Sequence, residues 1–136
     1  MLNSWFGKWL ALSVIGAGLA VTSCGGDGTG PDSDRAFVIV ESAGLMNGQN
    51  REHIGMDLRN KGGPGSWKMV AFGPNAAGSP RLHETDPSAV PAGWFETLAV
   101  SVPTPEGSPF PYVEKIIIYS RGDENTDWRK TGQHDF

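Results

Sequence analysis

Apolar and polar positions alternate clearly in two segments of this 136-residue chain. In residues 53–59, Ile54, Met56 and Leu58 are apolar, and the residues between them are polar or glycine. Because successive side chains of a strand point to opposite faces, a period of two predicts a strand with one buried face. The pattern recurs in residues 93–102, where the predicted inward side chains are Leu98, Val100 and Val102.

Two other segments are more continuously apolar. Residues 36–41 form a short β-branched run, which is typical of a strand buried on both faces or lying near an edge. Residues 112–121 are the most β-prone stretch and contain three consecutive isoleucines, at positions 116–118. Such a run needs cover on both sides, so we expect this strand at the centre of a sheet.

Residues 66–73 and 126–131 predict two further strands. In the first, the charged Lys68 favours burial of the residues in the opposite phase, Trp67, Met69 and Ala71. The other apolar positions of that segment leave its register open. The second is expected to close the sheet, with Trp128 in the core.

Segments rich in Gly, Pro and Asn separate the strands and predict turns, at residues 44–51, 60–65, 103–111 and 122–125. Residues 74–92 are expected to be mostly loop, with a short strand near residues 81–84. No segment after Cys24 has the capped, amphipathic pattern of a helix. About six or seven short antiparallel strands in residues 35–136 therefore predict an all-β fold, a small β-sandwich.

The first 23 residues have a different pattern. They contain one ionisable side chain, Lys8, followed by an apolar core and small residues, which is typical of a secretory signal. The apolar core has about 12 residues, fewer than the roughly 20 that a membrane-spanning helix needs. Residues 25–34 contain only Gly, Thr, Pro, Ser and Asp. We expect residues 24–34 to form a flexible tether.

The signal ends in Val21, Thr22, Ser23 and Cys24, which resemble the lipobox of bacterial lipoproteins. The resemblance implies cleavage between Ser23 and Cys24, a diacylglycerol on the Cys24 thiol, and further fatty acyl chains such as palmitate. Two or three acyl chains anchor a protein stably, whereas one does so only marginally. An ordinary secretory signal is the alternative. Under the family's sorting rule, Gly25 implies outer-membrane rather than inner-membrane delivery, if the source has an outer membrane.

Composition adds two constraints. Cys24 is the only cysteine, so the chain can form no intramolecular disulfide, and lipidation would account for an otherwise unpaired exported thiol. Removal of Lys8 with the signal leaves ten Lys and Arg against fifteen Asp and Glu, a net charge of −5. A net negative charge of this size gives no indication of the basic surface that binds nucleic acid. We expect membrane lipid to be contacted through acylated Cys24.

Several fragments are similar to the immunoglobulin-like domains of bacterial envelope proteins, the CARDB and FxLYD types among them. They are residues 56–62, which end in an Asn-x-Gly turn, residues 67–72, and residues 92–95 before 98–100. The chain departs from the FxLYD type, which has a Tyr-Asp pair where this chain has Gly73 and Pro74. The resemblance implies an immunoglobulin-like sandwich that acts as a spacer or interaction module and has no implied activity.

Trp94 and Phe95 are adjacent, so on a strand they point to opposite faces. One of them could lie on the surface and contact a sugar or a protein. We favour burial of both, because a sandwich of this size needs its few large side chains for the core.

The candidate oxygen ligands for calcium are Asp123, Glu124 and Asp127, between the last two strands, but the twelve-residue calcium-loop signature is absent. A charged hairpin tip is the favoured interpretation. The three histidines are scattered, and no serine lies in a Gly-x-Ser-x-Gly elbow. We therefore expect no metal site, no cofactor and no catalytic site.

The sequence thus predicts a lipid-anchored bacterial cell-envelope protein that is not an enzyme and acts as an interaction or structural module. Its expected partner, besides membrane lipid, is an envelope protein or glycan. The alternative is a carbohydrate- or calcium-binding module of the envelope.

Overall fold

Two antiparallel sheets contain all eight strands of the computed structural model, which describes residues 34–136. The predicted signal segment, with Ser23 and Cys24, lies outside the described residues. Within residues 34–136 the helical structure is one short 3-10 turn, η1 (Asn75–Ala77), so no helix there could cross a membrane. The predicted all-β fold is confirmed.

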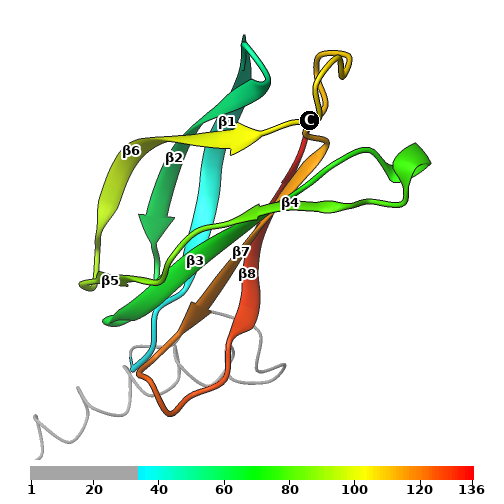
Figure 1. Ribbon diagram of the computed structural model, residues 1–136. Helices are drawn as coiled ribbons and strands as arrows, with labels where there is room; N and C mark the ends of the chain where they lie inside the picture. Colours follow the sequence, from blue (N-terminus) through cyan, green and yellow to red (C-terminus); the bar gives the residue numbers. More distant parts are fainter. Residues whose placement is uncertain (1–33) are drawn as a thin grey trace, which may run out of the picture. The chain divides into compact units, whose positions relative to one another are not determined.

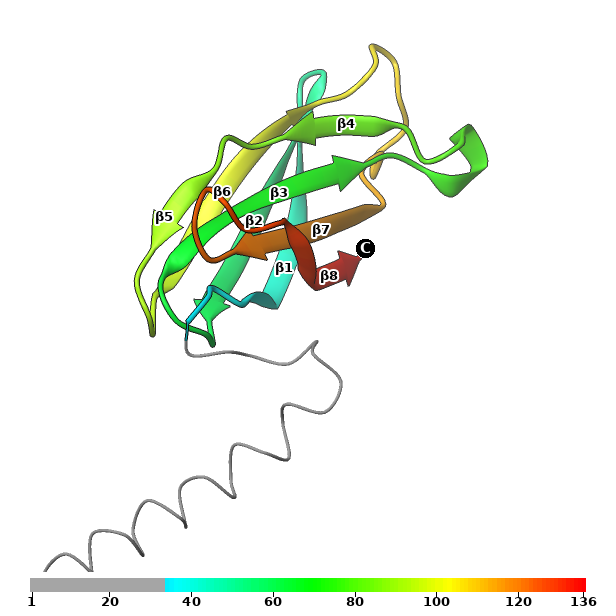
Figure 2. The same cartoon turned by 90° about the horizontal axis from the view of Figure 1, so that it is seen from below.

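The strands divide into two layers, which Figures 1 and 2 show from two directions. The smaller sheet has the order β1 (Val38–Gly48), β2 (Arg51–Asn60) and β6 (Phe95–Pro103). The larger sheet has the order β4 (Arg81–Glu84), β3 (Gly65–Phe72), β7 (Lys115–Arg121) and β8 (Arg129–Asp135). The short β5 (Ser88–Val90) also pairs with β3.

The core consists of the inward faces that the alternation predicts. On β2 the side chains of Ile54, Met56 and Leu58 are at most 2% exposed. On the facing sheet the buried side chains include Trp67, Met69 and Ala71 of β3 and Ile116 and Ile118 of β7. This confirms the register that Lys68 favours. It also confirms the central place of β7, which lies between β3 and β8.

The predicted turn over residues 44–51 is wrong for most of its length. β1 continues to Gly48, which pairs with Arg51, so the hairpin turn consists of Gln49 and Asn50. Asn50 adopts the positive φ of 57° that the turn requires, a conformation that asparagine tolerates well. Pairing with the long β2 keeps the glycines of β1 in a strand.

The closing strand was also misplaced. β8 begins at Arg129 and ends at Asp135, and Trp128 lies before it, not in the core. The Trp128 ring lies 4.8 Å from Lys68 Nζ and 4.2 Å from the Arg121 guanidinium carbon. Because Lys68 and Arg121 belong to the outward phase of β3 and β7, Trp128 covers the outer face of the larger sheet through cation–π contacts.

Two polar side chains are buried at the junctions of the strands. Asn60, at the end of β2, is 2% exposed and accepts hydrogen bonds from the backbone N–H groups of Phe37 and Gly62, at 2.9 and 3.0 Å. Its amide donates to the carbonyls of Gly63 and Pro91, both at 2.8 Å. One side chain thus joins three loops.

Glu52, near the start of β2, is 1% exposed. Its Oε1 atom accepts the backbone N–H groups of Tyr112 and Val113, at 2.5 and 2.6 Å. The carboxylate therefore holds the end of the β6–β7 connection, which loops out beyond the sheets in Figure 1.

Candidate functional site

The outer face of the smaller sheet presents side chains in regular rows. Since the inward phase of β2 is buried, the outward phase comprises Arg51, His53, Gly55, Asp57 and Arg59. Each of these residues pairs with one residue of β1 on one side and one residue of β6 on the other. A bulge in β1 shifts the register between Val40 and Ser42.

The middle row of this face has almost no side chains. Gly55 pairs with Gly44 of β1 and with Ala99 of β6, so the row Gly44, Gly55 and Ala99 crosses the sheet as a strip of exposed backbone. We call this strip, together with the row of side chains on each side of it, the trough; the strip is its floor. Two open depressions in the surface, of about 540 and 170 Å³, share Gly44 and Gly55 in their linings and lie on either side of the row.

The fold does not require the two glycines of the trough. A Cβ atom built on Gly44 or Gly55 would meet no other atom within 4 Å, and neither residue has a positive φ. Glycine inside a strand destabilises it by roughly 0.5–1 kcal/mol relative to alanine. Glycine inside a strand often marks a bulge, a bend or a place where a ligand or another chain approaches the backbone closely, and the register at Gly44 and Gly55 contains no bulge.

The first wall of the trough is the row Met46, His53 and Ser101. Its end on β1 is apolar, because the side chain of Met46 there is 69% exposed. Methionine is flexible and polarizable, so it adapts to different partner surfaces. Arg51, one row further, donates to the Ser101 hydroxyl at 2.6 Å.

The second wall is the row Ser42, Asp57 and Thr97, and it carries a negative charge. The Ser42 hydroxyl donates to Asp57 Oδ2 at 2.8 Å, and the Thr97 hydroxyl donates to Oδ1 at 2.6 Å. Both hydrogen bonds lower the pKa of Asp57 below its ordinary value, and the bond from Thr97 has the larger effect. Among residues 34–136, no Lys or Arg forms an ion pair with this carboxylate.

Phe95 and Trp94 lie on opposite sides of the smaller sheet, as adjacent strand residues do. Trp94 packs against the core, with its ring centroid 5.9 Å from that of Trp67. Phe95 is 48% exposed and has the Arg59 guanidinium carbon 4.6 Å from its ring centroid. The expected burial of both side chains is therefore wrong for Phe95. Arg59 also pairs with Glu41 at 2.8 Å.

Asp123, Glu124 and Asp127 lie exposed in the connection between β7 and β8. Asp123 Oδ1 accepts the Asn125 N–H at 2.8 Å, and the Thr126 hydroxyl donates to the Asp123 carbonyl at 2.8 Å. The Asp123 carboxylate thus supports its own turn. No group of three or more His, Cys, Asp or Glu side chains that could hold a metal ion is present in the described part of the chain.

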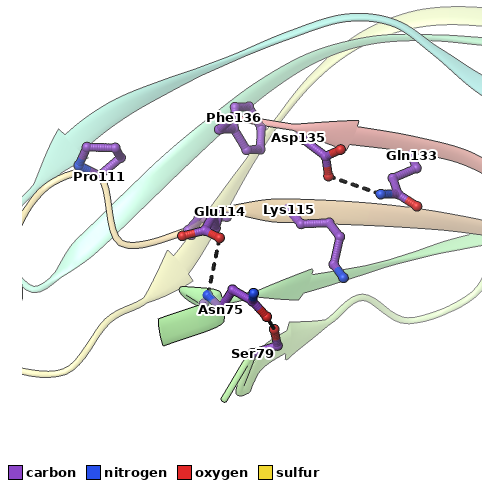
Figure 3. Close-up of a pocket in the computed structure, with 10 residues that line it drawn as sticks. Asn75, Ser79, Pro111, Glu114, Lys115, Gln133, Asp135 and Phe136 are labelled. Atoms are coloured by element: carbon purple, nitrogen blue, oxygen red, sulfur yellow. Dashed lines mark hydrogen bonds between the residues drawn. The ribbon is translucent and has the colours of Figure 1, made fainter. Parts of the chain in front are cut away.

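A third cavity, of about 500 Å³, lies between the 3-10 turn, β7 and β8, close to Phe136. Figure 3 shows that its polar side chains are largely paired with neighbours. Glu114 Oε1 accepts the Asn75 N–H at 3.2 Å, and Gln133 donates to Asp135 Oδ1 at 3.0 Å. Lys115 Nζ lies 5.0 Å from the Phe72 ring centroid. The groups that line this cavity form no nucleophile–base pair.

Comparison with known proteins adds no family to this description. A scan against protein-family models finds no match, and a search of curated proteins finds no significant relative.

The sequence interpretation missed the trough, although one signal was available. Gly55 stands in the outward phase of the alternating segment 53–59, where a strand would ordinarily carry a polar or β-branched side chain. Its pairing with Gly44 depends on the second half of β1, and the sequence predicts a turn there, over residues 44–51.

Proposed function

We propose that this chain is a lipid-anchored bacterial cell-envelope protein whose β-sandwich, of the immunoglobulin-like kind, acts as a non-enzymatic interaction module. The anchor rests on the lipobox-like residues 21–24 and on Cys24 as the only cysteine. The interaction role rests on the trough, where two glycines leave backbone exposed without any need in the fold. The proposed partners are membrane lipid, through acylated Cys24, and an envelope protein.

The location follows from the same features. The tether of residues 24–34 lets the sandwich stand off the membrane, while its acidic surface disfavours contact with anionic lipid. Because Gly25 follows the cysteine, we place the protein at the outer membrane if the source has one.

Fractionation combined with crosslinking tests this proposal. Cells expressing the full chain are treated with a crosslinker and separated into membrane and soluble fractions, alongside a Cys24→Ser variant. We expect the original chain in the membrane fraction, with discrete crosslinked species, and the variant uncleaved at residue 24. A soluble chain would contradict the anchor, and the absence of any crosslinked partner would contradict the interaction role.

A second candidate, binding of an envelope glycan, rests on the exposure of Phe95, since an aromatic ring on a sheet surface can stack on a sugar. One face of this ring is already covered by Arg59, which leaves less of it for a ligand. A glycan panel read by thermal shift tests this candidate, and stabilisation that Phe95→Ala abolishes would support it.

A further inference from the structure

The trough combines three properties that restrict what can occupy it. Its floor, the row Gly44, Gly55 and Ala99, is backbone with a single methyl group. One wall ends in the exposed Met46, and the other carries the ionised Asp57. These properties favour an occupant that is flat or slender, partly apolar and positively charged.

The dimensions suit an extended polypeptide. Neighbouring strands lie about 4.8 Å apart, so the floor from Gly44 to Ala99 is about 10 Å long, roughly three residues of an extended chain. The rows that form the walls lie two residues away on each side, which leaves roughly 13 Å between their backbones. This width accommodates one chain with its side chains.

The negative charge of Asp57 indicates which side chain of a bound segment would contact it. Both oxygens of Asp57 are oriented by hydroxyl groups, from Ser42 and Thr97, and each oxygen keeps capacity for a further donor. The nearby cation Arg59 is held by Glu41. A Lys or Arg side chain from outside would therefore supply the missing counter-charge, in a charge-assisted hydrogen bond.

A glycan fits these features less well. Sugar rings are commonly held on an aromatic side chain, and the floor and both walls of the trough contain no Phe, Tyr or Trp. We propose that the trough binds an extended segment of a partner protein, with an apolar side chain on the glycine floor and a Lys or Arg side chain at Asp57. This inference rests on the proposed interaction function.

The test screens the full chain, extracted in detergent and immobilised, against a phage-displayed library of random peptides. We expect enrichment of peptides that place an apolar residue beside Lys or Arg. Their binding should weaken at high salt, because it depends on the Asp57 charge.

Three variants locate the binding site. Gly55→Val fills the floor and should weaken the selected peptides at least about tenfold, with a thermal midpoint no lower than that of the original chain. Gly44→Ala adds one methyl group, so it tests the floor even if the valine variant folds poorly. Asp57→Asn should abolish the salt dependence. Ala89→Val, at an exposed small residue of β5 in the other sheet, is the matched control and should bind normally.

Several results would overturn the inference. They are the absence of enriched peptides, enriched peptides without a basic residue, equal binding to the floor variants and the original chain, and a glycan array that binds in a Gly55-dependent manner. If cells yield the same crosslinked partner with the original chain and with Gly55→Val, the trough assignment fails while the proposed function stands. Loss of membrane anchoring leaves the peptide result unaffected.

Discussion

At the scale of single residues, the buried polar side chains have the most definable roles. The Asn60 side chain bonds four backbone groups from three separate segments at distances of 2.8–3.0 Å. Buried backbone groups left without partners are destabilising, so its removal affects all three loops at once.

Asn60→Ala should lower the free energy of unfolding by about 4 kcal/mol, since each of the four lost hydrogen bonds contributes about 1 kcal/mol. Urea unfolding followed by tryptophan fluorescence measures the change. Asn125→Ala, at the exposed tip between β7 and β8, is the control and should alter stability by less than about 0.5 kcal/mol. Equal midpoints for the two variants would refute the role given to Asn60.

The glycines of this chain separate into those that packing needs and those that it does not. A Cβ on Gly65 would lie 2.1 Å from the Arg121 carbonyl oxygen, so Gly65→Ala should destabilise the fold by about 3 kcal/mol. Gly55→Ala meets open space and should stabilise it by about 0.5–1 kcal/mol. Thermal unfolding of the two variants checks both signs, and a destabilised Gly55→Ala would mean that the fold does need this glycine.

The pKa of Asp57 should depend on the two hydroxyl groups that donate hydrogen bonds to its carboxylate. Its lowered pKa in the folded state means that the ionised carboxylate contributes stability above the unfolded pKa of about 4, and that this contribution is lost as the pH falls through the folded pKa. Thr97→Val removes the larger cause and should raise the pKa toward its ordinary value. Carboxyl NMR titration measures it, and an unchanged midpoint would argue against the hydrogen bond.

At the scale of elements, the sequence predicted what local patterning controls. The alternation in β2 and β6 and the charged Lys68 in β3 each identify an inward face without knowledge of the partner strand, and the isoleucines of β7 indicate a central strand. Partner-dependent features were missed. β1 extends through Gly44 and Gly48 because β2 pairs with it along its length, and Trp128 leaves the core because two cations cover its ring.

The trough could be predicted only in part, for the same reason. A glycine in the outward phase of β2 is visible in the sequence, but a row across three strands depends on the register of β1 and β6 against β2. The Asp57 site depends likewise on Ser42 and Thr97, which lie 15 and 40 residues away along the chain.

The β6–β7 connection should depend on Glu52. Glu52→Ala removes two hydrogen bonds to a buried carboxylate and should lower stability by about 3 kcal/mol, whereas Glu52→Gln keeps an acceptor oxygen and should lose about 1 kcal/mol. Limited proteolysis should cut the alanine variant within residues 104–114 before any other site. Cleavage of both variants at the rate of the original chain would contradict this anchoring.

At the scale of the whole molecule, the proposed function divides the chain into two parts with separate proposed roles. Residues 34–136 form a sandwich whose core needs no disulfide, and its smaller sheet presents the trough on its outer face. The proposed acyl anchor at Cys24 would hold this domain at a membrane, where a weak interaction through the trough gains from a high local concentration.

Intact-mass analysis of the chain extracted from membranes tests the proposed anchor most directly. We expect a protein that begins at Cys24 and carries diacylglycerol, with or without a further acyl chain, whereas the Cys24→Ser variant should retain residues 1–23 and carry no lipid. A chain recovered without lipid from the soluble fraction, whether cleaved or intact, would contradict the proposed anchor.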